Sequence, residues 1–91
     1  MSNITVIYDM PTVTAEQYDE VIRGLEASGA GNPQGRLYHV ASPKEKGWLV
    51  VDVWESHELL NQFAQTLMPI MQNAGVTPPQ PQIYPVHNVI Q

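Results

Sequence analysis

The stretch GWLVVDVWE at residues 47–55 decides how this chain folds. Alternate side chains of a β-strand point to opposite faces, so the stretch divides into two sets. One face carries three aliphatic residues: Leu49, Val51 and Val53. The other face carries two indoles with a carboxylate between them: Trp48, Val50, Asp52 and Trp54. We interpret the first set as core and the second as a semi-polar surface that something else must cover.

Composition restricts what such a chain can do. Its 91 residues, 43% of them hydrophobic, predict one globular domain over residues 1–91. The net charge is −5 with only four Lys and Arg, which argues against nucleic acid and against anionic membrane surfaces as partners. The absence of cysteine excludes disulfides and thiolate-ligated metals. No apolar run reaches the ~18–20 residues of a membrane span and no signal peptide is evident, so we expect a cytoplasmic protein.

The remaining segments predict three more strands and two helices. Residues 3–9 and 35–42 alternate as strands, and residues 82–90 form a last strand in which Pro85 requires an edge position. Thr14 and Gln17 match a capping box that opens a first helix. Ser56 is the expected N-cap of a second helix that ends near Gly75, and Pro69 should kink or split it.

The resulting order is β-α-β-β-α-β. This order predicts a ferredoxin-like α+β fold, a four-stranded antiparallel sheet with both helices on one face. The other face would be left uncovered, and an apolar patch of that size usually marks an interface. We therefore expect a homodimer through the sheet face, with a small-molecule ligand bound between the two sheets.

The junction between the second hairpin strand and the second helix resembles a known family. Residues 51–56 (VDVWES), running into Leu59, Leu60 and Phe63, are similar to the strand-to-helix junction of antibiotic-biosynthesis-monooxygenase-like proteins, in the dimeric α+β barrel superfamily. The resemblance covers the whole chain in element order and residues 47–75 at the level of motif. It implies cofactor-free oxygenation of electron-rich phenols, haem degradation, or no chemistry. The haem-degrading pattern has a His along the second helix and an Asn within the first strand. Here His57 and Asn3 stand only at the beginnings of these elements, so we expect no cofactor.

The register of the hairpin decides whether Asp52 has a partner. If paired positions sum to an odd number, His39 shares a face with Asp52, while Tyr38 and Val40 lie on the helix side. An even sum instead places His39 under the helices and Arg36 near Asp52. We favour the odd register, because burying a His under two helices costs more than burying Val40. His39 and Asp52 are then the candidate catalytic pair, with the carboxylate orienting an imidazole that acts as a general base.

The other candidate residues would shape a ligand site. We expect the pocket walls to include the following residues: Trp48, Trp54, Tyr8 and Val50, with His87 as a further polar group or an interface residue. The three His residues lie on different elements without metal-ligand spacing, so we expect no metal. Two functions stay open. One is a small-molecule enzyme of the cofactor-independent monooxygenase type, and the other is a non-catalytic dimeric binding or stress-associated protein with a packed interior.

Overall fold

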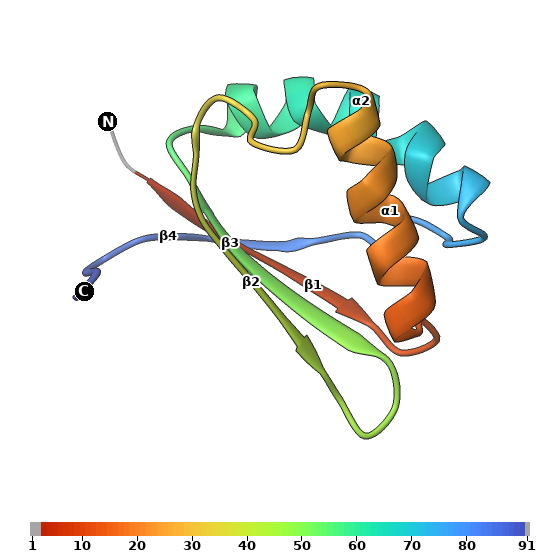
Figure 1. The fold of residues 1–91 in the computed structure, drawn as a ribbon. Helices are drawn as coiled ribbons and strands as arrows, with labels where there is room; N and C mark the ends of the chain where they lie inside the picture. The colour runs from red at the N-terminus through yellow and green to blue at the C-terminus, as the bar shows by residue number, and fades with distance from the viewer. Residues whose placement is uncertain (1–2, 91) are drawn as a thin grey trace.

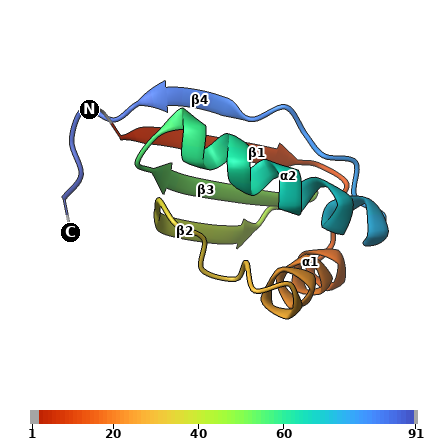
Figure 2. The same ribbon diagram turned by 90° about the horizontal axis from the view of Figure 1, so that it is seen from above.

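The computed structural model describes residues 3–90 and contains six elements in the expected order. The strands are β1 (Ile4–Met10), β2 (Arg36–Pro43), β3 (Trp48–Trp54) and β4 (Gln82–Pro85). The helices are α1 (Ala15–Ala27) and α2 (His57–Asn73). Both helices lie on the same side of the sheet, as Figures 1 and 2 show from two directions.

The sheet has the strand order β2-β3-β1-β4, and every neighbouring pair is antiparallel. Both central strands, β3 and β1, are therefore non-consecutive in the chain, as the ferredoxin-like fold requires. The predicted α+β fold is confirmed. Residues 1, 2 and 91 of the predicted domain lie outside the described part of the chain.

The two helices begin at the predicted caps. The Thr14 hydroxyl accepts a hydrogen bond from the Gln17 backbone, and the Gln17 side chain accepts one from the Thr14 backbone, which completes the capping box. The Ser56 side chain accepts from the backbone of Leu59 at the start of α2. Pro69 lies within α2 but does not split it, since the helix continues to Asn73.

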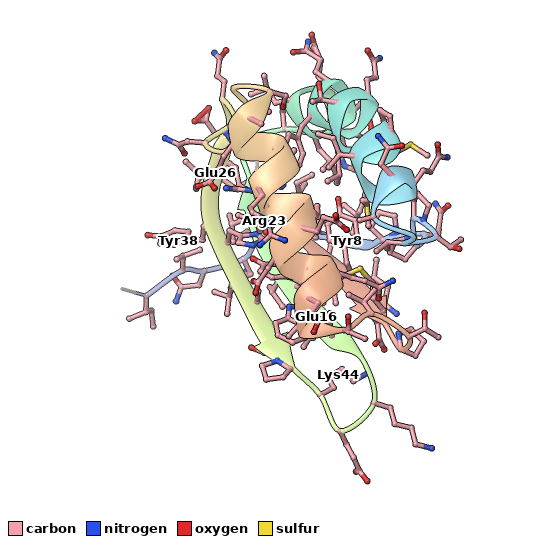
Figure 3. The ribbon with its side chains drawn as sticks, turned by 45° about the vertical axis from the view of Figure 1, so that its right-hand side comes forward. Tyr8, Glu16, Arg23, Glu26, Tyr38 and Lys44 are labelled. Carbon is pink, nitrogen blue, oxygen red and sulfur yellow. The ribbon has the colours of Figure 1, made fainter. Side chains whose placement is uncertain are left out.

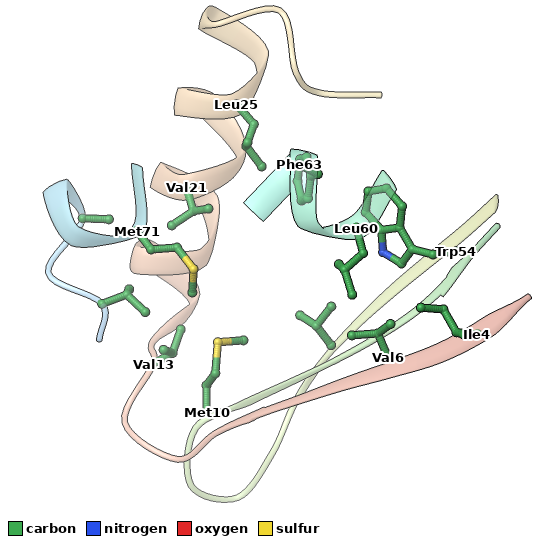
Figure 4. Close-up of a cluster of buried hydrophobic side chains, with 13 residues drawn as sticks. Ile4, Val6, Met10, Val13, Val21, Leu25, Trp54, Leu60, Phe63 and Met71 are labelled. Atoms are coloured by element: carbon green, nitrogen blue, oxygen red, sulfur yellow. The ribbon is translucent and has the colours of Figure 1, made fainter. Parts of the chain in front are cut away.

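The core fills the space between the helices and the sheet (Figure 4). Trp54 is fully buried, and its ring lies 5.2 Å from that of Phe63 on α2. The other buried hydrophobic residues come from both layers: Ile4, Val6, Met10, Val13, Val21, Leu25, Val50, Leu60, Met71, Ala74 and Val76. This core includes two members of the face of β3 that carries Asp52.

The assignment of the two faces of β3 in the sequence analysis was therefore wrong. The helices cover the side that carries Trp48, Val50, Asp52 and Trp54, and they leave the aliphatic side uncovered. Both faces of β3 are apolar enough to be core, and the carboxylate made the indole face appear the less suitable one. Its burial is tolerated because Asp52 is hydrogen-bonded, as described below.

We call the uncovered side of the sheet the open face. Strand pairing and alternation assign it these residues: Thr5, Ile7, Asp9, Tyr38, Val40, Ser42, Leu49, Val51, Val53, Gln82 and Tyr84. Tyr38 and Val40, expected under the helices, lie here with 38% and 56% of their surface exposed. Figure 3 shows Tyr38 on the side of β2 that is away from the helices.

The last strand is shorter than expected. It ends at Pro85 and pairs only with β1, so the proline occupies the edge position that it requires. One further backbone contact, from Val86 to Asn3, continues beside it. Within residues 3–90, no helix has the length and apolar character needed to cross a membrane.

Candidate functional site

A chain of side-chain hydrogen bonds connects α1 to the centre of the sheet. His39 on β2 pairs directly with Asp52 on β3, which confirms the odd register over residues 38–43. Its Nδ1 lies 2.6 Å from Asp52 Oδ1. Its Nε2 lies 2.7 Å from the hydroxyl of Tyr18 on α1. The three side chains thus form a continuous series of short contacts.

The acceptor character of the carboxylate fixes the direction of these bonds. Ionised Asp52 can only accept, so the proton of the neutral imidazole lies on Nδ1. The Nε2 atom then carries the lone pair and accepts from the Tyr18 hydroxyl. The second oxygen, Oδ2, accepts from Trp54 Nε1 at 3.4 Å. Asp52 is 3% exposed, whereas the His39 side chain is 23% exposed and reaches toward solvent.

A β-bulge at Leu37 brings a second basic side chain to the same side. Arg36 pairs with Trp54, but Tyr38 already pairs with Val53, so one residue of β2 is unpaired. Arg36 and His39 are three residues apart, yet both line the helix side of the sheet. The Arg36 guanidinium donates to the Gly31 carbonyl at 3.1 Å and lies 5.9 Å from the centre of the Phe63 ring. The Arg36–Trp54 pair thus follows the even sum, whereas the pairs from Tyr38 to Pro43 follow the odd sum that brings His39 opposite Asp52.

These groups lie at one side of a cavity between the helices and the sheet. Its volume is about 60 Å³, and it is partly open to solvent. Tyr8, Tyr18, Arg36, His39 and Asp52 supply the polar part of its lining. The rest is apolar: Met10, Val13, Val21, Ile22, Leu25, Val50, Phe63, Leu67, Met71 and Val76. The cavity thus combines an apolar interior with one imidazole–carboxylate pair.

Two phenols in the lining are held in the neutral form. Burial, together with the charge of Asp52, raises the pKa of Tyr8 to about 12. Burial also raises the pKa of Tyr18, although the Arg36 guanidinium acts in the opposite direction. Both hydroxyls therefore stay protonated at neutral pH and can donate hydrogen bonds.

Tyr18 is also the centre of an aromatic cluster. Its ring is stacked on His39, with centroids 6.1 Å apart and an interplanar angle of 8°. It is stacked on Trp48 as well, at 5.3 Å and 23°. The buried Nε1 of Trp48 has no hydrogen-bond partner within residues 3–90.

The structure places the predicted ligand residues in different environments. Tyr8 and Val50 line the cavity. Trp54 lies under α2 in the core, and Trp48 contacts Tyr18, but neither indole lines the cavity. His87 is exposed beyond the end of β4 and does not line it either.

Sequence reasoning missed one polar residue of the site, Tyr18, and considered another, Arg36, only under the even register. The helical spacing of Tyr18 with Val21 and Leu25 predicts only a core position on α1. The available signal was its hydroxyl, since a buried tyrosine usually needs a hydrogen-bond partner. Arg36 shares a face with His39 only through the bulge, and an odd separation in a strand predicts the opposite.

The described residues contain no group of three or more His, Asp or Glu side chains that could hold a metal ion.

Comparisons with known proteins give structural matches only. No family model matches this chain, and no curated protein matches it in sequence. Among solved structures, SnoaB, a cofactor-independent oxygenase from Streptomyces nogalater, is 12% identical with a TM-score of 0.64, over 99% of this chain and 98% of that one. A candidate antibiotic biosynthesis monooxygenase from Chloroflexus aurantiacus is 16% identical with a TM-score of 0.70, at the same coverage. One from Deinococcus radiodurans is 14% identical with a TM-score of 0.58, over 100% and 97%.

The fold and the site together define a ferredoxin-like α+β domain with an imidazole–carboxylate pair beside an apolar cavity. More particularly, the chain has the fold of the antibiotic-biosynthesis-monooxygenase-like proteins, as the resemblance at the strand-to-helix junction implied.

Proposed function

We propose that this chain is a small dimeric enzyme of the cofactor-independent monooxygenase type, in which His39 and Asp52 form the catalytic base. The 2.6 Å hydrogen bond between His39 and Asp52 at the wall of an apolar cavity carries this proposal. The fold that it shares with a cofactor-independent oxygenase supports it. The substrate class is a small, electron-rich phenol.

The proposed reaction begins with a proton transfer. The His39 Nε2 lone pair takes the phenolic proton of the substrate, and the buried Asp52 carboxylate stabilises the resulting imidazolium. The phenolate can then transfer an electron to dioxygen, which a neutral phenol does far less readily. One oxygen atom forms a new bond to a ring carbon, and the other leaves as water with the two hydrogens that the phenol loses. The overall balance is phenol plus O2 to quinone plus H2O.

The lining of the cavity suits an anionic intermediate. The Arg36 guanidinium can attract a phenolate oxygen, since it forms no ion pair within residues 3–90. Tyr8 and Tyr18 remain protonated and can donate to the same oxygen. Tyr18 occupies His39 Nε2, so the substrate hydroxyl must replace that of Tyr18 when it binds.

The size of the cavity sets a condition. A cavity of about 60 Å³ is smaller than the ~150 Å³ that holds benzene, so an aromatic ligand requires α1 to move away from the sheet. Ligand binding should therefore be slower than a diffusion-limited encounter.

Oxygen consumption with a panel of hydroquinones and polycyclic phenols tests the proposed activity. We expect turnover by the unaltered chain without added metal or cofactor, and its loss in His39→Gln. Lys46→Gln, in the exposed turn between β2 and β3, is the matched control and should keep full activity. Equal turnover in both variants would remove His39 from the mechanism.

We also propose that two copies associate through the open face. Asp9 is the one charged residue assigned to this face, and its carboxylate is paired with Lys44 at 2.6 Å. A largely apolar surface whose one charged residue is paired can pack against a second copy related by a two-fold axis. Sedimentation velocity should show a dimer that Val51→Glu dissociates and Lys46→Glu does not. A monomer at micromolar concentration for the unaltered chain would contradict this assembly.

One observation favours the alternative of a non-catalytic binding protein. The cavity is small, and Tyr18 already satisfies His39 Nε2, so the three side chains could serve only to hold α1 on the sheet. In that case His39→Gln should lower the thermal stability, and no phenol should be consumed by either protein. The cytoplasmic location expected from the sequence stays a prediction.

A further inference from the structure

Tyr18 has the surroundings of a residue that can be oxidised by one electron. When a phenol loses an electron, its hydroxyl becomes a strong acid. The electron therefore leaves readily only where an acceptor is ready for the proton. The Tyr18 hydroxyl has such an acceptor in His39 Nε2, at 2.7 Å.

The rest of the hydrogen-bond series stabilises the product of that transfer. An imidazolium at His39 would lie 2.6 Å from the Asp52 carboxylate, which is buried and cannot move into solvent. The bond formed there joins two opposite charges, so it is stronger than the present bond, in which only the carboxylate is charged. The proton needs to move along only one existing hydrogen bond, without rearrangement of the side chains.

We propose that Tyr18 is a redox-active tyrosine whose proton passes to His39 as its electron passes to an oxidant in the cavity. The products are a neutral tyrosyl radical, an imidazolium at His39 held by Asp52, and an oxidant reduced by one electron. No covalent bond other than the Tyr18 O–H is broken.

The neighbouring oxidisable rings lack such an acceptor. Trp48 is stacked on Tyr18 at 5.3 Å, close enough to exchange an electron with it, but its Nε1 has no hydrogen-bond partner within residues 3–90. Tyr8 lines the same cavity, but the hydroxyl bonded to His39 Nε2 is that of Tyr18. The radical should therefore reside on Tyr18 even when the electron first leaves Trp48.

The oxidant class that oxygen chemistry provides is a peroxyl radical. When no phenol is bound, Tyr18 still occupies His39 Nε2, and there it reduces a small peroxyl radical that enters the cavity to the hydroperoxide anion, which the His39 imidazolium protonates. The net change is peroxyl radical plus the Tyr18 phenol to hydroperoxide plus the Tyr18 radical. The oxidation of Tyr18 itself depends only on the arrangement of the side chains, and it holds whether or not the chain oxidises phenols.

Photochemical oxidation of the full chain tests this inference without any substrate. Tris(bipyridine)ruthenium(III), generated by a light flash in the presence of persulfate, is the oxidant. The protein carries Tyr38→Phe and Tyr84→Phe, because both of these tyrosines lie on the open face and would give radicals of their own. Transient absorption gives the rate of radical formation, and electron paramagnetic resonance identifies the radical.

We expect a tyrosyl signal that disappears in Tyr18→Phe and persists in Tyr8→Phe, the matched control from the same cavity. His39→Gln should slow its formation at least about tenfold, which corresponds to ~1.4 kcal/mol of barrier. In deuterated water the rate should fall in the protein that keeps Tyr18 and His39, because the proton moves together with the electron.

An equal rate in His39→Gln, or a radical on Tyr8 or Trp48, would overturn the inference. The isotope experiment requires no substitution at the site, so it decides the question even if His39→Gln folds poorly. An equal rate in light and heavy water would also overturn it. No phenol substrate is present in this experiment, so its outcome does not test the proposed monooxygenase activity. That activity is tested by oxygen consumption alone.

Discussion

Asp52→Asn should reverse the hydrogen bonds around His39 while it keeps the volume of the side chain. Trp54 Nε1 can only donate, so the amide of Asn at position 52 must turn its oxygen toward Trp54. Its NH2 group then faces His39 Nδ1, which has to accept. The imidazole proton therefore moves to Nε2 and is donated to the Tyr18 oxygen, and the lone pair proposed as the base is lost.

The cost in stability can be estimated from the same contacts. A hydrogen bond to a charged group contributes ~1.5–3 kcal/mol, and a neutral one contributes ~0.5–1.5 kcal/mol. The variant loses this difference, but it no longer buries a carboxylate, which offsets part of the loss. We expect a net destabilisation of about 1 kcal/mol, equivalent to a decrease of roughly 4–8 °C in Tm for a domain of this size.

Two measurements check the prediction. Long-range 1H–15N NMR correlation distinguishes a proton on Nδ1 from one on Nε2, and thermal unfolding followed by circular dichroism gives the change in Tm. Asp9→Asn is the matched control, because Asp9 and Lys44 form an exposed ion pair on the same sheet. It should change stability by less than about 0.5 kcal/mol. If His39 keeps its proton on Nδ1 in Asp52→Asn, the argument that Trp54 orients position 52 is refuted.

Two further predictions concern the backbone and high pH. Gly47 has φ +94° and its absent Cβ would lie 2.2 Å from the Met10 carbonyl oxygen, whereas Gly29 has φ +82° and open space around it. Gly47→Ala should therefore abolish or severely weaken folding. Gly29→Ala should lower the free energy of unfolding, measured in urea, by only about 1 kcal/mol of conformational strain. An equally small loss of stability in Gly47→Ala would show that the hairpin end can move away from β1. The pKa of Tyr8 is raised to about 12, so the folded state keeps a proton that the unfolded state loses near pH 10. The free energy of unfolding should then fall as the pH rises from about 10 to 12. The titration of phenolate absorbance should lose its last step in Tyr8→Phe. An unchanged titration in this variant would contradict the burial of the Tyr8 hydroxyl.

Several features of the fold and the site follow from local patterns in the sequence. The capping box at Thr14, the cap at Ser56 and the edge position of Pro85 each depend on a few neighbouring residues. The pairing of His39 with Asp52 followed from the parity of the hairpin and one comparison of burial costs. That comparison chose the correct register although its premise failed, because His39 does lie under the helices.

The remaining features depend on interactions between distant parts of the chain. Which face of β3 meets the helices could not be read from the strand alone, since both faces are apolar. Asp52 is compensated by His39 and Trp54, but the second nitrogen of His39 is satisfied by Tyr18, which belongs to α1 and precedes His39 by 21 residues. The bulge at Leu37 leaves no turn or glycine signature within the strand itself. Its effect on Arg36 therefore appears only in three dimensions.

The bulge also suggests a way to search for relatives of this site among proteins of the same fold. In an unbroken strand, two residues that face one cavity are separated by an even number of positions. Here the sequence pattern is Arg-x-x-His, followed 13 positions after the His by an Asp, and the odd first spacing is the mark of the bulge. A chain with Arg and His two positions apart could present the same pair without a bulge. A chain with three positions must carry the extra residue. Spacing alone could thus separate relatives that share this local geometry from those that reach a similar cavity by another route.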